Sequence, residues 1–125
     1  GQYTHAACWM VAAAAALGEL GIAFLELREP GPDGTFGKSD RPAVAPLIRK
    51  AYKGVLVLNS DYTFERATEA LASGAADAIS FGRKFLANPD LPKRFAAGLP
   101  LNVDDMRTWY SQGAEGYTTY PTAEG

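Results

Sequence analysis

Two short polar stretches follow apolar runs of the chain, one at residues 59–61 and one at residues 82–83. Their members are Asn59, Ser60, Asp61, Gly82 and Arg83. Capping side chains and backbone N–H groups just ahead of a helix stabilise an anion. A glycine lets the backbone approach a phosphate closely, and an arginine can bind its oxygens with a two-pronged fork. The two stretches together predict a phosphate site, whereas each alone also fits an ordinary strand-to-helix turn or a solvated arginine.

Other residues with reactive side chains are more isolated. His5 is the only histidine, and no nucleophile pattern or metal-ligand cluster surrounds it, so we expect it on the surface of a helix. Glu26 and Glu29 flank a strand end and could act as acid or base, but an ion pair with Arg28 or Lys38 is the expected use.

An aromatic pair, Trp109 and Tyr110, lies in a glycine-flanked segment without periodicity. Such a pair fits a core, and it also fits a wall beside a planar ligand, where rings stack and the tyrosine keeps a polar group.

The elements that must position these residues follow from apolar periodicity and from glycine and proline stops. Helices are predicted at residues 4–20, 43–52, 63–73, from 84 to the break at 88–90, and at 91–97; strands at 21–27, 54–58 and 76–81; a loop at 29–37; and an irregular segment at 98–125. Strand, loop and helix thus occur three times over, which predicts parallel strands joined by right-handed crossovers.

Three parallel strands leave two open sheet edges, and residues 54–58 are apolar on both faces, as in a strand covered by helices on both sides. A small open sheet with further strands would solve this, but the first segment is too rich in alanine for a strand. The pattern favours a portion of a larger α/β barrel. In such barrels the loops after the last two strands form the usual phosphate site, which matches the two polar stretches.

Composition narrows the class of protein. The 125 residues are 47% hydrophobic and 21% charged, which predicts one globular domain. A net charge of −2 with dispersed basic residues argues against nucleic acid or a membrane surface as partner. No apolar run is long enough to span a bilayer, and the single cysteine, Cys8, fits a reducing compartment. We therefore expect a cytoplasmic protein.

Four stretches of the sequence strongly resemble the C-terminal third of the old yellow enzyme family, the FMN-dependent ene-reductases. They are GIAFLELREP, GVLVLNSDY, ADAISFGRKFLANPDLPKR and TWYSQGAEGYTTYP, and they occur in order between residues 21 and 121. The resemblance implies a (β/α)8 TIM barrel, of which this chain holds the sixth, seventh and eighth strands with their helices. Another chain or segment would supply the complementary N-terminal part.

The resemblance also implies roles for the polar stretches and the aromatic pair. Residues that match Ser60 and Asp61, mainly through their backbone, and Gly82 and Arg83 hold the FMN phosphate in that family, and Asn59 adjoins them. The aromatic pair falls on Trp109, beside the dimethylbenzene edge of the flavin, and Tyr110, in the substrate pocket. Ser111 and Gln112 replace glycines that often follow the pair, so the shape of this pocket differs.

The implied chemistry is hydride transfer from NADH or NADPH to FMN and then to a small activated alkene. The family's flavin-ring contacts, its pair of substrate-binding residues and its tyrosine proton donor belong to earlier strands. This chain is therefore expected to carry no catalytic residue and to be inactive and unstable alone. The alternative is a stand-alone, non-catalytic module that binds a phosphate or nucleotide.

Overall fold

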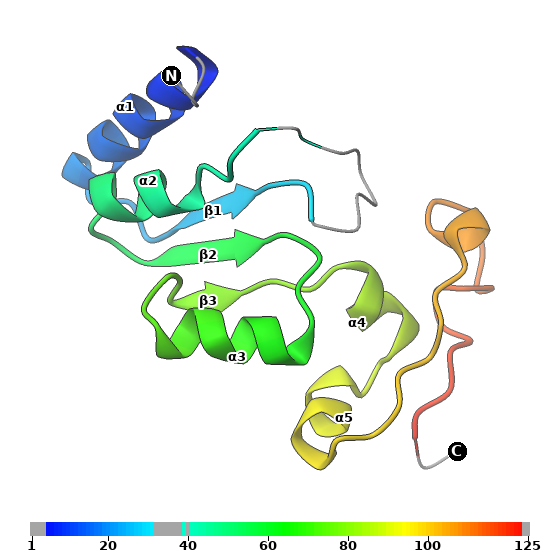
Figure 1. The fold of residues 1–125 in the computed structure, drawn as a ribbon. Helices are drawn as coiled ribbons and strands as arrows, with labels where there is room; N and C mark the ends of the chain where they lie inside the picture. Colours follow the sequence, from blue (N-terminus) through cyan, green and yellow to red (C-terminus); the bar gives the residue numbers. More distant parts are fainter. Residues whose placement is uncertain (1–4, 32–38, 40, 124–125) are drawn as a thin grey trace. The chain divides into compact units, whose positions relative to one another are not determined.

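The computed structural model describes residues 5–31, 39 and 41–123, which fall into two compact units, residues 1–80 and 81–125. The first unit contains α1 (His5–Glu19), β1 (Leu25–Arg28), α2 (Ala45–Ala51), β2 (Leu56–Asn59), α3 (Phe64–Ala72) and β3 (Ala78–Ile79) (Figure 1). The second contains α4 (Arg83–Ala87), α5 (Leu91–Ala97) and the short 3-10 helix η1 (Met106–Thr108).

The three strands form one parallel sheet in the order β1-β2-β3, as the sequence predicts. Leu27 pairs with Leu58, and Leu58 pairs with Ile79. Each connection therefore steps to the next position in the same direction along the sheet. Because such crossovers are right-handed, α2 and α3 lie on the same face of the sheet.

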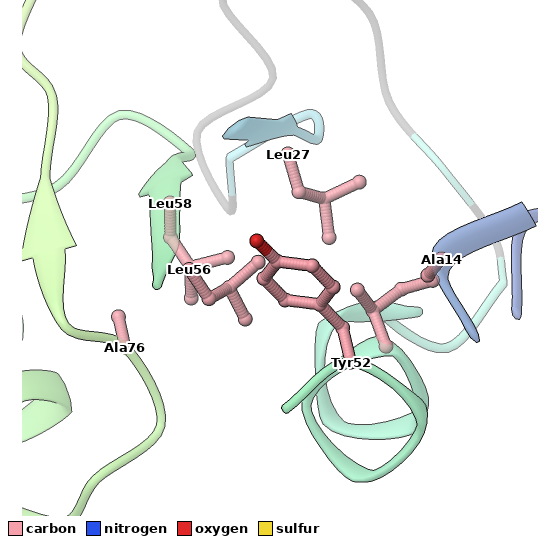
Figure 2. Packing of buried hydrophobic residues seen from close by; sticks show 7 residues of the cluster. Ala14, Leu27, Tyr52, Leu56, Leu58 and Ala76 are labelled. Carbon is pink, nitrogen blue, oxygen red and sulfur yellow. The ribbon is translucent and has the colours of Figure 1, made fainter. Parts of the chain in front are cut away.

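The hydrophobic core of the first unit lies on one face of the sheet (Figure 2). Leu27, Leu56 and Leu58 point toward Tyr52 at the end of α2 and Ala14 of α1, and all five are buried. The ring of Tyr52 is fully buried at the centre of this cluster.

The opposite face of the sheet carries Glu26, Val57, Asn59 and Ser80, which alternate with the core residues and are only partly buried or exposed. The two faces of β2 thus differ, and Val55 beside it is 47% exposed. The prediction that residues 54–58 are covered by helices on both faces is wrong within the described residues, because the sequential strand order places α2 and α3 on one side only.

Element boundaries follow local chemistry. Thr63 caps α3 by accepting a hydrogen bond from the N–H of Arg66, and Ser73 closes it, as the predicted range of 63–73 requires. The helix predicted from residue 43 begins instead at Ala45, with Pro46 in its first turn. The strands are shorter than predicted: β1 begins at Leu25 rather than at Gly21, whose φ of 69° ends α1.

Candidate functional site

The polar residues that follow β2 lie against the loop that follows β1. The backbone carbonyl of Asn59 accepts a hydrogen bond from the N–H of Glu29 (3.0 Å), and the Ser60 hydroxyl donates to the carbonyl of Pro30 (3.3 Å). The carboxyl ends of two neighbouring parallel strands therefore share one edge of the sheet, where ligands bind in α/β proteins.

Close packing at this edge requires a glycine. A Cβ on Gly31 would lie 2.7 Å from Cβ of Asp61 and 2.9 Å from the carbonyl oxygen of Ser60. Asp61 itself has a φ of 50°, in the left-handed region that few residues other than glycine, asparagine and aspartate adopt. The turn after β2 is thus held in an uncommon conformation by the loop beside it.

Arg66, on the first turns of α3, fixes the orientation of this turn. Its Nη1 lies 3.4 Å from the carbonyl oxygens of both Ser60 and Asp61. Because a trans peptide directs its C=O and N–H to opposite sides, the N–H groups of Asp61 and Tyr62 point away from Arg66. The turn therefore presents N–H donors on the side opposite the guanidinium, as an anion cradle needs.

Tyr62 follows this turn and contacts Arg66. The guanidinium of Arg66 stacks over its ring at 4.7 Å from the centroid. Burial raises the pKa of Tyr62 and outweighs the lowering by Arg66, while Glu29 adds to the rise. The phenol is therefore neutral near neutral pH.

Glu29 stabilises the start of α2. Its carboxylate accepts hydrogen bonds from the N–H groups of Val44 (2.8 Å) and Ala45 (3.0 Å) and so caps the start of α2. Glu26 accepts a hydrogen bond of 2.6 Å from the Ser80 hydroxyl on the polar face of the sheet. Helix capping by Glu29 and the hydrogen bond from Ser80 to Glu26 come in addition to the expected ion pairing with Arg28 or Lys38, which stays a prediction; Lys38 lies outside the described residues.

In the second unit, Gly82 and Arg83 lie where the sequence places them, just beyond β3 and at the start of α4. Gly82 is exposed, and a Cβ built on it would meet no atom within 4 Å, so its backbone is open to approach. Arg83 is the first residue of α4 and is partly buried.

The aromatic pair belongs to the same unit. Trp109 follows η1, which Asp105 caps by accepting a hydrogen bond from the N–H of Arg107. Trp109 is partly buried, whereas Tyr110 is 90% exposed. A planar group could therefore contact Tyr110 without any rearrangement of the segment.

The first unit thus brings Asn59, Ser60 and Asp61 together with the loop after β1, and the second unit contains Gly82, Arg83, Trp109 and Tyr110. His5 is exposed on α1, as expected. Among the described residues, no group of three or more potential metal ligands lies together. None of the described helices is long and apolar enough to cross a bilayer.

Sequence reasoning missed the residues that orient these groups. Gly31 acts on the turn after β2 from a loop that is distant in sequence, whereas Arg66 lies only five or six residues beyond the carbonyls that it contacts. The pair Asp90 and Arg94 has the i,i+4 spacing of a helical ion pair, a signal that was open to sequence reasoning.

Comparison with known proteins assigns a family to this arrangement. Residues 3–102 match the family described as NADH:flavin oxidoreductase / NADH oxidase. A 12-oxophytodienoate reductase-like protein of Solanum lycopersicum is 43% identical over 109 residues, which cover 86% of this chain and 29% of that protein. A probable flavin mononucleotide-dependent alkene reductase of Leishmania infantum is 51% identical over 73 residues, 58% of this chain and 20% of that protein.

Solved structures give the same result. The old yellow enzyme homologue of Zymomonas mobilis has a TM-score of 0.84 and 58% identity, over 89% of this chain and 31% of that structure. Morphinone reductase has a TM-score of 0.85 and 36% identity, over 98% of this chain and 32% of that structure. The chain therefore spans about a third or less of the length of these relatives.

Proposed function

Because this chain belongs to the NADH:flavin oxidoreductase / NADH oxidase family, we propose that it forms part of an FMN-dependent ene-reductase. Such an enzyme reduces activated C=C bonds of unsaturated carbonyl or nitro compounds with NADH or NADPH. The resemblance to old yellow enzymes predicted from the sequence is confirmed by the family match and by the solved structures. FMN as the cofactor of the family agrees with the name of the alkene reductase relative.

The observation that carries the proposal is the one-sided parallel sheet. An open, doubly wound sheet needs helices on both faces, whereas a barrel has its helices outside and its strands' other face inside. Here one face, with Leu27 and Leu58, is covered by helices, and the opposite face carries Glu26, Val57, Asn59 and Ser80, which are only partly buried or exposed. We infer that β1, β2 and β3 are the sixth, seventh and eighth strands of a (β/α)8 barrel that further sequence completes.

We assign the grip on the FMN phosphate to the two polar stretches. The N–H groups of the Asp61 and Tyr62 peptides, turned away from Arg66, supply uncharged donors. Gly82 offers open backbone, and Arg83 offers a permanent positive charge for the phosphate dianion. Asn59 at the end of β2 adjoins Ser60 and Asp61 in the chain, and each of the two stretches offers donors of the kind that a phosphate group needs.

We assign the pocket wall to the aromatic pair, with Trp109 beside the flavin and Tyr110 beside the alkene. The bound FMN would supply the hydride chemistry, which the side chains of this chain cannot perform. The groups that hold the activating oxygen of the substrate and donate the proton would come from the complementary N-terminal part of the barrel.

The replacement Arg83→Ala in the complete barrel tests the phosphate assignment. We expect FMN to bind more weakly by about 2 kcal/mol, because a charge-assisted hydrogen bond to phosphate is lost. Flavin release measured by fluorescence would give this value, and Lys93→Ala, which removes an exposed charge of the same unit, is the matched control. Equal FMN affinity in both variants would overturn the assignment.

If the protein binds no flavin, the alternative function applies, that of a non-catalytic module that binds a phosphate or nucleotide. Mass analysis of the ligands and chains that co-purify with the protein separates the two. FMN together with a complementary segment supports the reductase, whereas a folded monomer of residues 1–125 without flavin supports the module.

A further inference from the structure

Arg94 is a buried charge in the second unit. Only 5% of the residue is exposed, and its guanidinium donates three short hydrogen bonds. Nε bonds to Oδ1 of Asp90 (2.8 Å), Nη1 to the carbonyl of Pro100 (2.7 Å) and Nη2 to the carbonyl of Pro121 (2.9 Å). One side chain on α5 therefore contacts two points of the chain that are 21 residues apart.

A second set of buried or partly buried polar groups reinforces the same two points. The side-chain oxygen of Asn88, which is fully buried, accepts a hydrogen bond from the N–H of Asn102 (2.7 Å). The Asn102 amide donates in turn to the carbonyls of Ala87 and Pro121, both at 2.8 Å. Both ends of the segment 100–121 are thus fixed to α4 and α5.

The carboxylate of Asp90 makes a further contact with the end of this segment. While Oδ1 pairs with Arg94, Oδ2 accepts a hydrogen bond of 2.8 Å from the N–H of Ala123. Asp90 therefore neutralises the buried guanidinium and holds the chain that leaves the segment.

Between its fixed ends the segment is compact. Gly116 is buried with a φ of 71°, and a Cβ there would overlap the side chain of Thr108. The Tyr120 hydroxyl accepts a hydrogen bond from the N–H of Asp105 (2.8 Å). Trp109 and Tyr110 lie within this closed loop, so displacement of its ends would move the aromatic pair.

We propose that Arg94 is a positioning residue for the aromatic pair: by fixing the carbonyls of Pro100 and Pro121 to α5, it sets the place of Trp109 and Tyr110. The substrate side of this proposal rests on the proposed function. Arginine is required because its planar fork can reach Asp90 and two carbonyls at once, whereas a lysine ammonium is a single point of charge.

The test compares Arg94→Ala and Arg94→Lys with the control Lys93→Ala in the complete flavoenzyme. Hydrogen exchange of backbone amides in residues 100–123, followed by mass spectrometry, shows whether Arg94 fixes this segment. The measurement does not depend on flavin chemistry. We expect exchange in this segment to quicken on the order of tenfold in both Arg94 variants, with no change at α1 and none in the control.

Steady-state kinetics reports on the aromatic pair. We expect KM for the alkene to rise on the order of tenfold in Arg94→Lys, with the rate of flavin reduction by NAD(P)H within about twofold of the parent enzyme. Arg94→Lys keeps the charge beside Asp90, so it decides the matter if Arg94→Ala does not fold.

Unchanged exchange in residues 100–123 of Arg94→Lys would overturn the proposal. Faster exchange with an unchanged KM would also overturn it, because the aromatic pair would then be positioned by other contacts. An enzyme without flavin or alkene reduction would refute the proposed function instead, and the exchange data would still decide whether Arg94 holds the segment.

Discussion

Different interactions stabilise each of the two units of the chain. Residues 1–80 surround an apolar cluster in which Tyr52, Leu56 and Leu58 are buried against helices. Within residues 81–123 there is little regular structure beyond short helices, and the buried polar residues Asn88 and Arg94 connect the segments. A parallel sheet is specified by apolar periodicity, whereas an irregular segment needs directional hydrogen bonds to adopt one conformation.

The largest effect that separates the units is expected from Tyr52→Ala. The ring is fully buried, and its removal should lower the free energy of unfolding by about 3–5 kcal/mol through lost burial and a cavity. Denaturant unfolding of the complete barrel measures this value.

Tyr52→Phe is the matched control, because the Tyr52 hydroxyl is buried with no hydrogen-bond partner among the described residues. Its removal should leave stability unchanged or raise it by about 1 kcal/mol. A loss in Tyr52→Phe as large as in Tyr52→Ala would show that the core of the first unit depends on a polar contact too.

A smaller loss, about 2 kcal/mol, is expected from Asn88→Ala in the second unit. The variant leaves the N–H of Asn102 and the carbonyl of Lys84 without the amide that now bonds to both. Calorimetry of Asn88→Ala beside the exposed control Lys93→Ala checks the value. Equal stability of the two variants would mean that polar contacts do not hold this unit.

Acid should weaken both units through their carboxylates, among them Asp77 in the first unit and Asp90 in the second. Hydrogen bonds from the Leu56 N–H and from Arg49 lower the pKa of Asp77, and hydrogen bonds from the Ala123 N–H and from Arg94 lower the pKa of Asp90. A folded-state pKa below the unfolded value of about 3.9 stabilises the protein above that pH, and this stability is lost as pH falls through the folded pKa.

Unfolding measured from pH 7 down to pH 2 therefore distinguishes the two carboxylates. Asp77→Asn and Asp90→Asn should each lower stability at pH 7 and flatten the decline below pH ~4. A variant whose acid decline matches that of the parent protein would show that its carboxylate does not contribute.

The smallest effect on stability is expected from Tyr110→Phe, within about 0.5 kcal/mol, because Tyr110 is 90% exposed. Flavin reduction by NAD(P)H should stay nearly intact, while Tyr110→Ala should change KM and preference among alkenes more than the maximal rate. Abolished alkene reduction in Tyr110→Phe with intact flavin reduction would identify the hydroxyl as the proton donor and contradict the assignment.

The fold was predictable where one periodic pattern determines it. The sequence of residues 63–73 predicted a capped helix, and the repeated strand and helix pattern predicted the parallel sheet. The one-sided burial of β2 was not predictable from Val55 and Val57, because apolar residues on both faces of a strand do not say which face the crossovers cover.

The site was predictable as residues but not as geometry. Asn59, Ser60, Asp61, Gly82 and Arg83 stood out by chemistry and spacing, and their role in phosphate binding stays a prediction. The support by Gly31 and Glu29 depends on contacts that are distant in sequence, such as Glu29 with Val44, and no local signal encodes such contacts. Arg66 lies only five or six residues from the carbonyls that it contacts, but its contact depends on the conformation of the turn between them.

The order β1-β2-β3 has a consequence for biosynthesis. Each of β2 and β3 pairs with the strand made just before it, so a growing chain meets its partner strand already synthesised. Leu25 pairs with Leu56 and Val57 with Ala78, so each pairing waits only for one intervening helix to be made. The arrangement therefore suits folding in step with translation, in which each strand and helix is added to a surface that the preceding pair has already formed.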